Sequence, residues 1–99
     1  MILDGHIHVM AMTEPEPARL LAILAQAEIA GGVLLSLPPE SFSGLTASTK
    51  QRLDNLLAWC NGHDRLFPFF WIDPLADDAL DQIQAACVNG VAGFKVICD

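Results

Sequence analysis

Apolar and polar residues alternate along residues 2–9, which is the pattern of a β-strand with two different faces. One face would be apolar and would pack against helices. The other face would carry three polar side chains in a row: Asp4, His6 and His8. Burying these groups without partners would be unfavourable by a few kcal/mol each. We therefore expect this polar face to find partners or to have a function.

Three further apolar runs predict strands at residues 33–37, 66–72 and 91–97. The run at 33–37 is nearly all apolar, which is typical of a parallel strand that is buried on both faces. Pro68 lies inside the second run and cannot donate a ladder hydrogen bond. It is tolerated only near the start of a strand or at a bulge.

Apolar residues spaced three to four positions apart predict three helices between these strands. The first would begin at a capping box in residues 13–16 and end at Gly31–Gly32. The second would span residues 47–60, with Thr46 or Ser48 as its N-cap.

The third helix would be capped by Asp77–Asp78 and closed by Asn89–Gly90, and residues 40–44 would form a loop. Three of its side chains would face the sheet: Leu80, Ile83 and Cys87. The order β-α-β-α-β-α-β predicts the α/β class, with parallel strands joined by right-handed helical crossovers.

The composition fits a single globular domain over residues 1–99. The chain is 53% hydrophobic, and its net charge of −7 comes from twelve carboxylates against five basic residues. The basic residues form no cluster apart from Lys50 and Arg52, so we expect neither nucleic acid nor an anionic membrane as a partner. No segment is long and apolar enough to span a membrane, and no secretory signal precedes the first strand, which favours the cytoplasm.

The three cysteines, by contrast, add little to the functional picture. They are widely spaced, at Cys60, Cys87 and Cys98, and no two of them form a CxxC motif, so we expect reduced thiols. Cys60 and Cys87 would lie on the apolar faces of helices and serve packing.

The histidine pair is the first candidate site, because parallel α/β folds place their sites at the carboxyl ends of the strands. His6 and His8 would end the first strand, about 6.6 Å apart along it. Their ring nitrogens could coordinate one metal ion with bonds of about 2.1 Å. The alternative is a pair of structural histidines. His63 precedes the third strand, so it would lie at the opposite end of the sheet from the histidine pair, as a surface or loop residue.

Lys95 is the second candidate. The alternation that turns Phe94 and Val96 toward the helices turns Lys95 inward, among the other strand ends. A lysine there could carry a carboxylate that bridges metals, form a Schiff base, or pair with Asp4 or Asp73. It could also simply extend to solvent.

These residues resemble the amidohydrolase superfamily. The segment Asp4-Gly5-His6-Ile7-His8 looks like the HxH metal motif of its first strand, and residues 69–74 and 90–95 are similar to its third and fourth strand ends. The resemblance implies a (β/α)8 TIM barrel with one or two divalent metals, usually zinc. It also implies hydrolysis of an amide, ester or related bond in a small-molecule substrate by a metal-activated water, although some relatives decarboxylate instead. By this likeness His6 and His8 would be metal ligands, and Lys95 would stand where some members hold a carboxylated, metal-bridging lysine.

The chain also departs from that family. A complete barrel needs about 250 residues, whereas four strands make only the first half of one. The later histidine ligands and the aspartate that handles the proton of the water have no counterpart, so we expect little or no catalysis from this chain alone. Two open sheet edges predict self-association.

Two other functions stay open. One is a lyase or aldolase that uses Lys95 as a Schiff-base lysine. The other is a non-catalytic fragment or interaction module whose histidines are structural.

Overall fold

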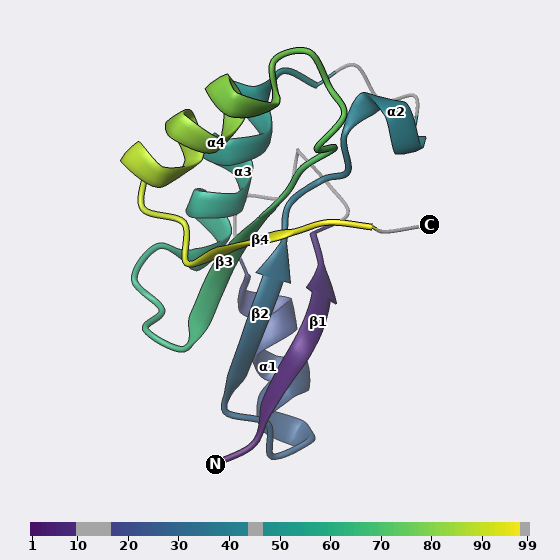
Figure 1. Ribbon diagram of the computed structural model, residues 1–99. Helices are drawn as coiled ribbons and strands as arrows, with labels where there is room; N and C mark the ends of the chain where they lie inside the picture. Colours follow the sequence, from purple (N-terminus) through teal and green to yellow (C-terminus); the bar gives the residue numbers. More distant parts are fainter. Residues whose placement is uncertain (10–16, 44–46, 98–99) are drawn as a thin grey trace.

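The computed structural model describes residues 1–9, 17–43 and 47–97, and within them four strands form one parallel sheet (Figure 1). The strands lie side by side in sequence order: β1 (Leu3–His8), β2 (Gly31–Leu35), β3 (Leu66–Trp71) and β4 (Gly93–Lys95). The α/β class with a parallel sheet is thus confirmed.

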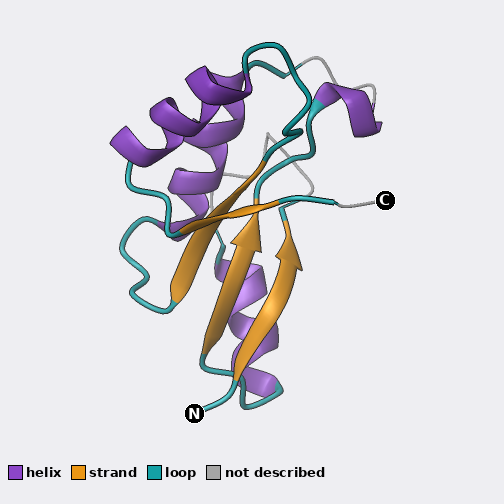
Figure 2. Ribbon diagram, viewed as in Figure 1, coloured by secondary structure: helices purple, strands orange, loops and turns teal. Residues whose placement is uncertain are grey.

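The helices are α1 (Ala18–Gln26), α2 (Glu40–Ser43), α3 (Thr49–Cys60) and α4 (Ala79–Val88), coloured purple in Figure 2. Three of them, α1, α3 and α4, cover the same face of the sheet. Their apolar side chains join those of β2 and β3 in one buried cluster, which includes Leu24, Leu34, Leu53, Leu56, Phe70 and Ala86. None of the described helices has the length and apolar character needed to cross a membrane.

The end of α1 differs from the sequence prediction. The helix stops at Gln26, and Glu28 adopts a left-handed conformation with φ of 59°. Gly31 and Gly32, predicted to end this helix, instead begin β2. A Cβ at Gly31 would collide with the backbone of Arg65, and one at Gly32 with the backbone oxygen of Asp4. These glycines therefore allow close approach of neighbouring strands rather than a helix stop.

The second predicted helix is confirmed as α3, and Ser48 is its N-cap. The Ser48 Oγ accepts from the backbone N–H of Gln51, whose side chain in turn accepts from the backbone N–H of Ser48. This reciprocal arrangement is a capping box. The expected loop at 40–44 is partly wrong, because α2 forms there. The predicted capping box at 13–16, Thr46 and Cys98 lie outside the described residues.

The inner face of α4 is also shifted from its predicted position. Leu80 is 75% exposed and Cys87 is exposed, whereas Gln82 and Ala86 are buried. The helix is turned so that Ala86, rather than Leu80 or Cys87, joins the core cluster. Asp78 is the N-cap, but its carboxylate accepts from the side chain of Gln82 rather than from a backbone N–H.

The last strand is shorter than predicted, and its start explains how Pro68 is tolerated. β4 covers only residues 93–95 rather than 91–97. The carbonyl of Pro68 faces the β4 side, where it accepts from the backbone N–H of Ala92 at 2.7 Å. The missing N–H of Pro68 points to the same side, just before β4 begins, so no ladder partner is lost.

Candidate metal-binding site

His6 and His8 meet at the carboxyl end of β1. Their Nε2 atoms are 2.7 Å apart, and their ring centroids are 4.6 Å apart. The register between β1 and β2 shifts between Asp4 and Ile7, so β1 is irregular where His6 lies. The backbone N–H of His6 donates to Asp4 Oδ1 at 2.9 Å within this irregular segment. Such irregularities redirect side chains, which accounts for a closer approach than an even strand allows.

The surroundings of His8 favour its neutral form. In this arrangement one Nε2 carries a hydrogen and donates to the other, so the two neutral rings are different tautomers. The pKa of His8 is lowered from its usual value, first by desolvation and then by the positive charges of His6 and Lys95. His8 is therefore mainly neutral at neutral pH, which is the form that binds a metal ion.

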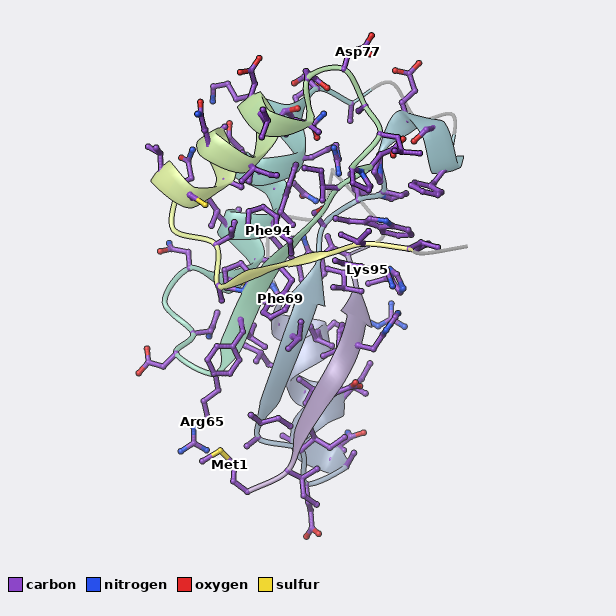
Figure 3. The ribbon with its side chains drawn as sticks, in the orientation of Figure 1. Met1, Arg65, Phe69, Asp77, Phe94 and Lys95 are labelled. Atoms are coloured by element: carbon purple, nitrogen blue, oxygen red, sulfur yellow. The ribbon has the colours of Figure 1, made fainter. Side chains whose placement is uncertain are left out.

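Lys95 lies on the same face of the sheet as the histidines, as the alternation predicts. Trp71 and Lys95 are register partners on β3 and β4, so their side chains point the same way. The Nζ atom of Lys95 lies 5.0 Å from the centroid of the Trp71 ring. Phe94, next to Lys95, packs instead against the core on the helix side. Both residues of β4 are labelled in Figure 3.

Trp71 connects the two candidate groups. Its ring centroid is 5.6 Å from that of His8, and on another side it stacks with Phe42 of α2 at 5.9 Å. Lys95 makes the third contact. The structure therefore brings His8 and Lys95 against one indole ring, and His6 joins this group through its contact with His8.

Two buried polar side chains hold the main chain of Trp71. The Ser36 Oγ accepts from the backbone N–H of Trp71 at 2.9 Å and donates to the carbonyl of Leu37 at 3.0 Å. The guanidinium of Arg52 donates to the carbonyls of Trp71 and Leu37, and it lies 4.4 Å over the ring of Phe70. Burial lowers the pKa of Arg52 to about 10, partly offset by Asp78, so the guanidinium stays charged at neutral pH.

Sequence reasoning did not single out Trp71, Phe42 or Arg52. The first of them could have been found, because Trp71 ends a strand at a position that parity places beside Lys95. Phe42 could not, since it lies on the short helix α2 where a loop was expected. The role of Arg52 depends on a tertiary contact that no local pattern reveals.

The remaining polar candidates do not join this group. Asp73 accepts from Ser41 Oγ at 2.8 Å and from the backbone N–H of Leu75 at 3.0 Å, which is a turn-forming role. His63 lines a separate cavity with Gly62 and Arg65, before the start of β3. The expectation that His63 lies away from the site is confirmed.

The donor set fits two ligands of a metal site. The two Nε2 atoms are 2.7 Å apart, and two nitrogens bound to a tetrahedral zinc are about 3.4 Å apart, so the rings need to separate by less than 1 Å. Among residues 1–9, 17–43 and 47–97, no group of three or more His, Cys, Asp or Glu side chains is arranged so that it could hold a metal ion. A complete zinc site requires further ligands beyond the histidine pair.

Two larger hollows lie elsewhere, on the side of the helices. The first, of about 450 Å³, lies between α3 and α4. The second, of about 550 Å³, is lined by residues of α2, of the start of α3 and of the segment before α4, together with Gln82 of α4. Neither lining includes His6, His8 or Lys95. They are therefore separate from the candidate metal site.

Comparison with known proteins adds no relative. No protein-family model matches the sequence, and no curated protein or solved structure shows significant similarity to it. The likeness to amidohydrolases thus rests on the motif and its place in the order of strands.

Proposed function

We propose that this chain supplies the first metal ligands of a metal-dependent hydrolase of the amidohydrolase type, which acts on an amide or ester bond of a small-molecule substrate. In this proposal its four strands are one half of a (β/α)8 barrel. The observation that carries the proposal is the convergence of the His6 and His8 Nε2 atoms, 2.7 Å apart at the carboxyl end of β1. Sites of parallel α/β proteins lie at this end of the sheet.

The chain's own residues would share the work as follows. His6 and His8 would hold the ion, most commonly zinc, through their Nε2 atoms. Lys95 would place a positive charge near the pair or, after carboxylation, would add a bridging oxygen ligand. A divalent metal bound here supplies a Lewis acid and lowers the pKa of a bound water. Proton transfer by a carboxylate would need a group outside this arrangement, because Asp4 is engaged with the backbone of His6.

A zinc titration tests the proposal directly. The metal-free chain would compete for zinc with a chromophoric chelator at neutral pH, beside the double variant His6→Ala/His8→Ala. The control is His63→Ala, since the third histidine belongs to the other end of the sheet and only its backbone atoms are hydrogen-bonded to Cys60 and Leu66. We expect wild type and His63→Ala to bind one zinc per chain, weakly, and the double variant to bind none. Equal binding by all three proteins, or none by wild type, would refute the proposal.

The Schiff-base alternative gives a different result. Lys95 is half-buried beside Trp71, and a covalent imine would require its Nζ to leave that ring and attack a carbonyl carbon. Borohydride added with a panel of carbonyl compounds would then fix the compound on Lys95, detected as a mass increase of the intact chain. The hydrolase proposal predicts no such increase. A purely structural role of the histidines predicts loss of stability in the double variant, without any metal dependence.

We propose further that the sheet associates with a second copy of the chain. β1 and β4 are its two edges, and α1, α3 and α4 cover only one face. Unpaired strand edges favour association with a further strand. Sedimentation velocity over a range of concentrations should show a dimer at high concentration. A single folded monomer at every concentration would contradict this.

A further inference from the structure

We propose that Trp71 is a positioning residue of this site, and that its indole ring fixes the places of His8 and Lys95 relative to each other. This inference rests on the proposed function, because it assumes that the histidine pair binds a metal ion. It concerns a residue that makes no contact with that ion and acts through the groups it touches.

The first support is the set of contacts around the ring. His8, Phe42 and Lys95 all contact the indole, from three elements that are distant in the sequence. His8 is otherwise an exposed side chain at the end of an edge strand, where the ring of His6 is its other neighbour. A ring packed against it restricts that rotation, and the attraction of the Lys95 ammonium to the indole face restricts Lys95 in the same way.

The second support is the way the main chain of Trp71 is held. Ser36 accepts from its N–H, and Arg52 donates to its carbonyl. Both side chains are buried, and both also bond the carbonyl of Leu37, so they tie the end of β3 to the segment after β2. A residue held at both backbone groups by buried polar partners is a fixed support for its neighbours.

The indole N–H does not contribute to this role. Nε1 of Trp71 is buried and has no hydrogen-bond partner. An unpaired buried donor is unfavourable, so the benefit of a tryptophan here comes from its ring. Phenylalanine at this position would keep a ring beside His8 and remove the unpaired donor.

Zinc affinity of three variants tests the inference. Groups that orient a metal ligand typically change affinity by 10- to 100-fold when they are replaced. We therefore expect Trp71→Leu and Trp71→Met to weaken zinc binding by about 10-fold or more, while Trp71→Phe stays within about 3-fold of wild type. Trp59→Leu is the matched control, because Trp59 packs on the helix side of the sheet and also has an unpaired Nε1.

Fluorescence quenching gives a second readout. The chain has two tryptophans, so Trp59→Phe leaves only Trp71 and Trp71→Phe leaves only Trp59. Paramagnetic Co2+ should quench the first variant strongly and the second only weakly. Equal quenching of the two would place the bound ion away from Trp71 and overturn the inference.

The possible failures are distinguishable. No zinc binding by wild type refutes the proposed function itself. Zinc binding that depends on His6 and His8, yet is unchanged in folded Trp71→Leu and Trp71→Met, refutes the positioning role alone. If neither of these variants has the circular dichroism spectrum of the wild type, the ring serves stability and the inference also fails.

Discussion

The two faces of the sheet carry different kinds of side chain. On the face covered by helices, Leu34, Leu56 and Phe70 are completely buried. On the opposite face, at the carboxyl end, His6 and His8 are exposed and Lys95 is half-buried. One face holds the apolar contacts that stabilise the fold, and the other holds the candidate metal-binding and reactive side chains.

The difference shows that the two faces can be changed separately, except where they are joined. The junction is the end of β3: Phe70 belongs to the core, and the next residue, Trp71, contacts His8 and Lys95. Arg52 and Ser36 reach this junction from the helix side and from the end of β2. Substitutions on each face, and at the junction, test how independent the faces are.

The largest effect is expected in the helix-covered core. Leu56→Ala removes a side chain with no exposed surface and leaves a cavity, so we expect a loss of about 3 kcal/mol in the free energy of unfolding. Leu80→Ala, at a leucine that is 75% exposed, should change it by about 0.5 kcal/mol or less. Urea denaturation of both variants measures the difference. Equal losses would mean that α4 is covered in solution by another surface.

A smaller effect is expected between β1 and β2. A Cβ at Gly32 would collide with the backbone oxygen of Asp4 and approach the side chain of Ile7 to 2.8 Å, so Gly32→Ala should cost about 2 kcal/mol. Gly5→Ala is the control, because a Cβ at Gly5 meets nothing within 4 Å. The urea concentrations at the unfolding midpoints of the two variants measure this difference, and that of Gly32→Ala should be the lower. A harmless Gly32→Ala would indicate that β1 is held loosely against β2.

The junction should show an intermediate loss of stability. Ser36→Ala leaves the buried backbone N–H of Trp71 without its acceptor, which should cost about 1.5 kcal/mol. Ser41→Ala is the matched control, since its hydroxyl bonds the carboxylate of Asp73 at an exposed position. Thermal unfolding of the two variants separates a buried from an exposed hydrogen bond. If both lose the same stability, water replaces the Ser36 hydroxyl at the junction.

The smallest effect is the pH dependence that His8 contributes. Its pKa is lowered in the folded chain, so the unfolded chain takes up the proton more readily. This group therefore has no effect on stability well above pH 6.5, and it destabilises the fold as the pH falls below 6.5. The melting temperature should fall further between pH 7.5 and 5.5 in wild type than in His8→Ala. A parallel fall in both proteins would show that His8 titrates normally.

The parallel strands and the side of the sheet on which Lys95 lies could be read from the sequence, because both follow from simple periodicities, whereas its neighbour Trp71 was not expected. Alternation placed Lys95 opposite Phe94, and the βα spacing predicted parallel strands. The convergence of His6 and His8 was underestimated, since a strand of even geometry was assumed and the irregularity after Asp4 depends on pairing with β2.

Other errors arose where tertiary contacts override local signals. Gly31 and Gly32 look like a helix stop, but close approach to Arg65 and Asp4 is what requires them. Leu80 looks like a core residue of an amphipathic helix, yet α4 is rotated so that Ala86 joins the core cluster and Leu80 is exposed. Helix periodicity gives the existence of an apolar stripe, whereas the neighbouring elements decide which residues it contacts.

The sequential order of the strands has a consequence for how the chain folds. Each strand pairs with the next one along the chain, so every new pairing closes one loop that contains a single crossover. Folding can then proceed as repeated closures of similar size, without one long-range closure that must come first. Such topologies have moderate contact order and fold at intermediate rates. A further strand could be added beside β4 or β1 without rearranging the existing ladder.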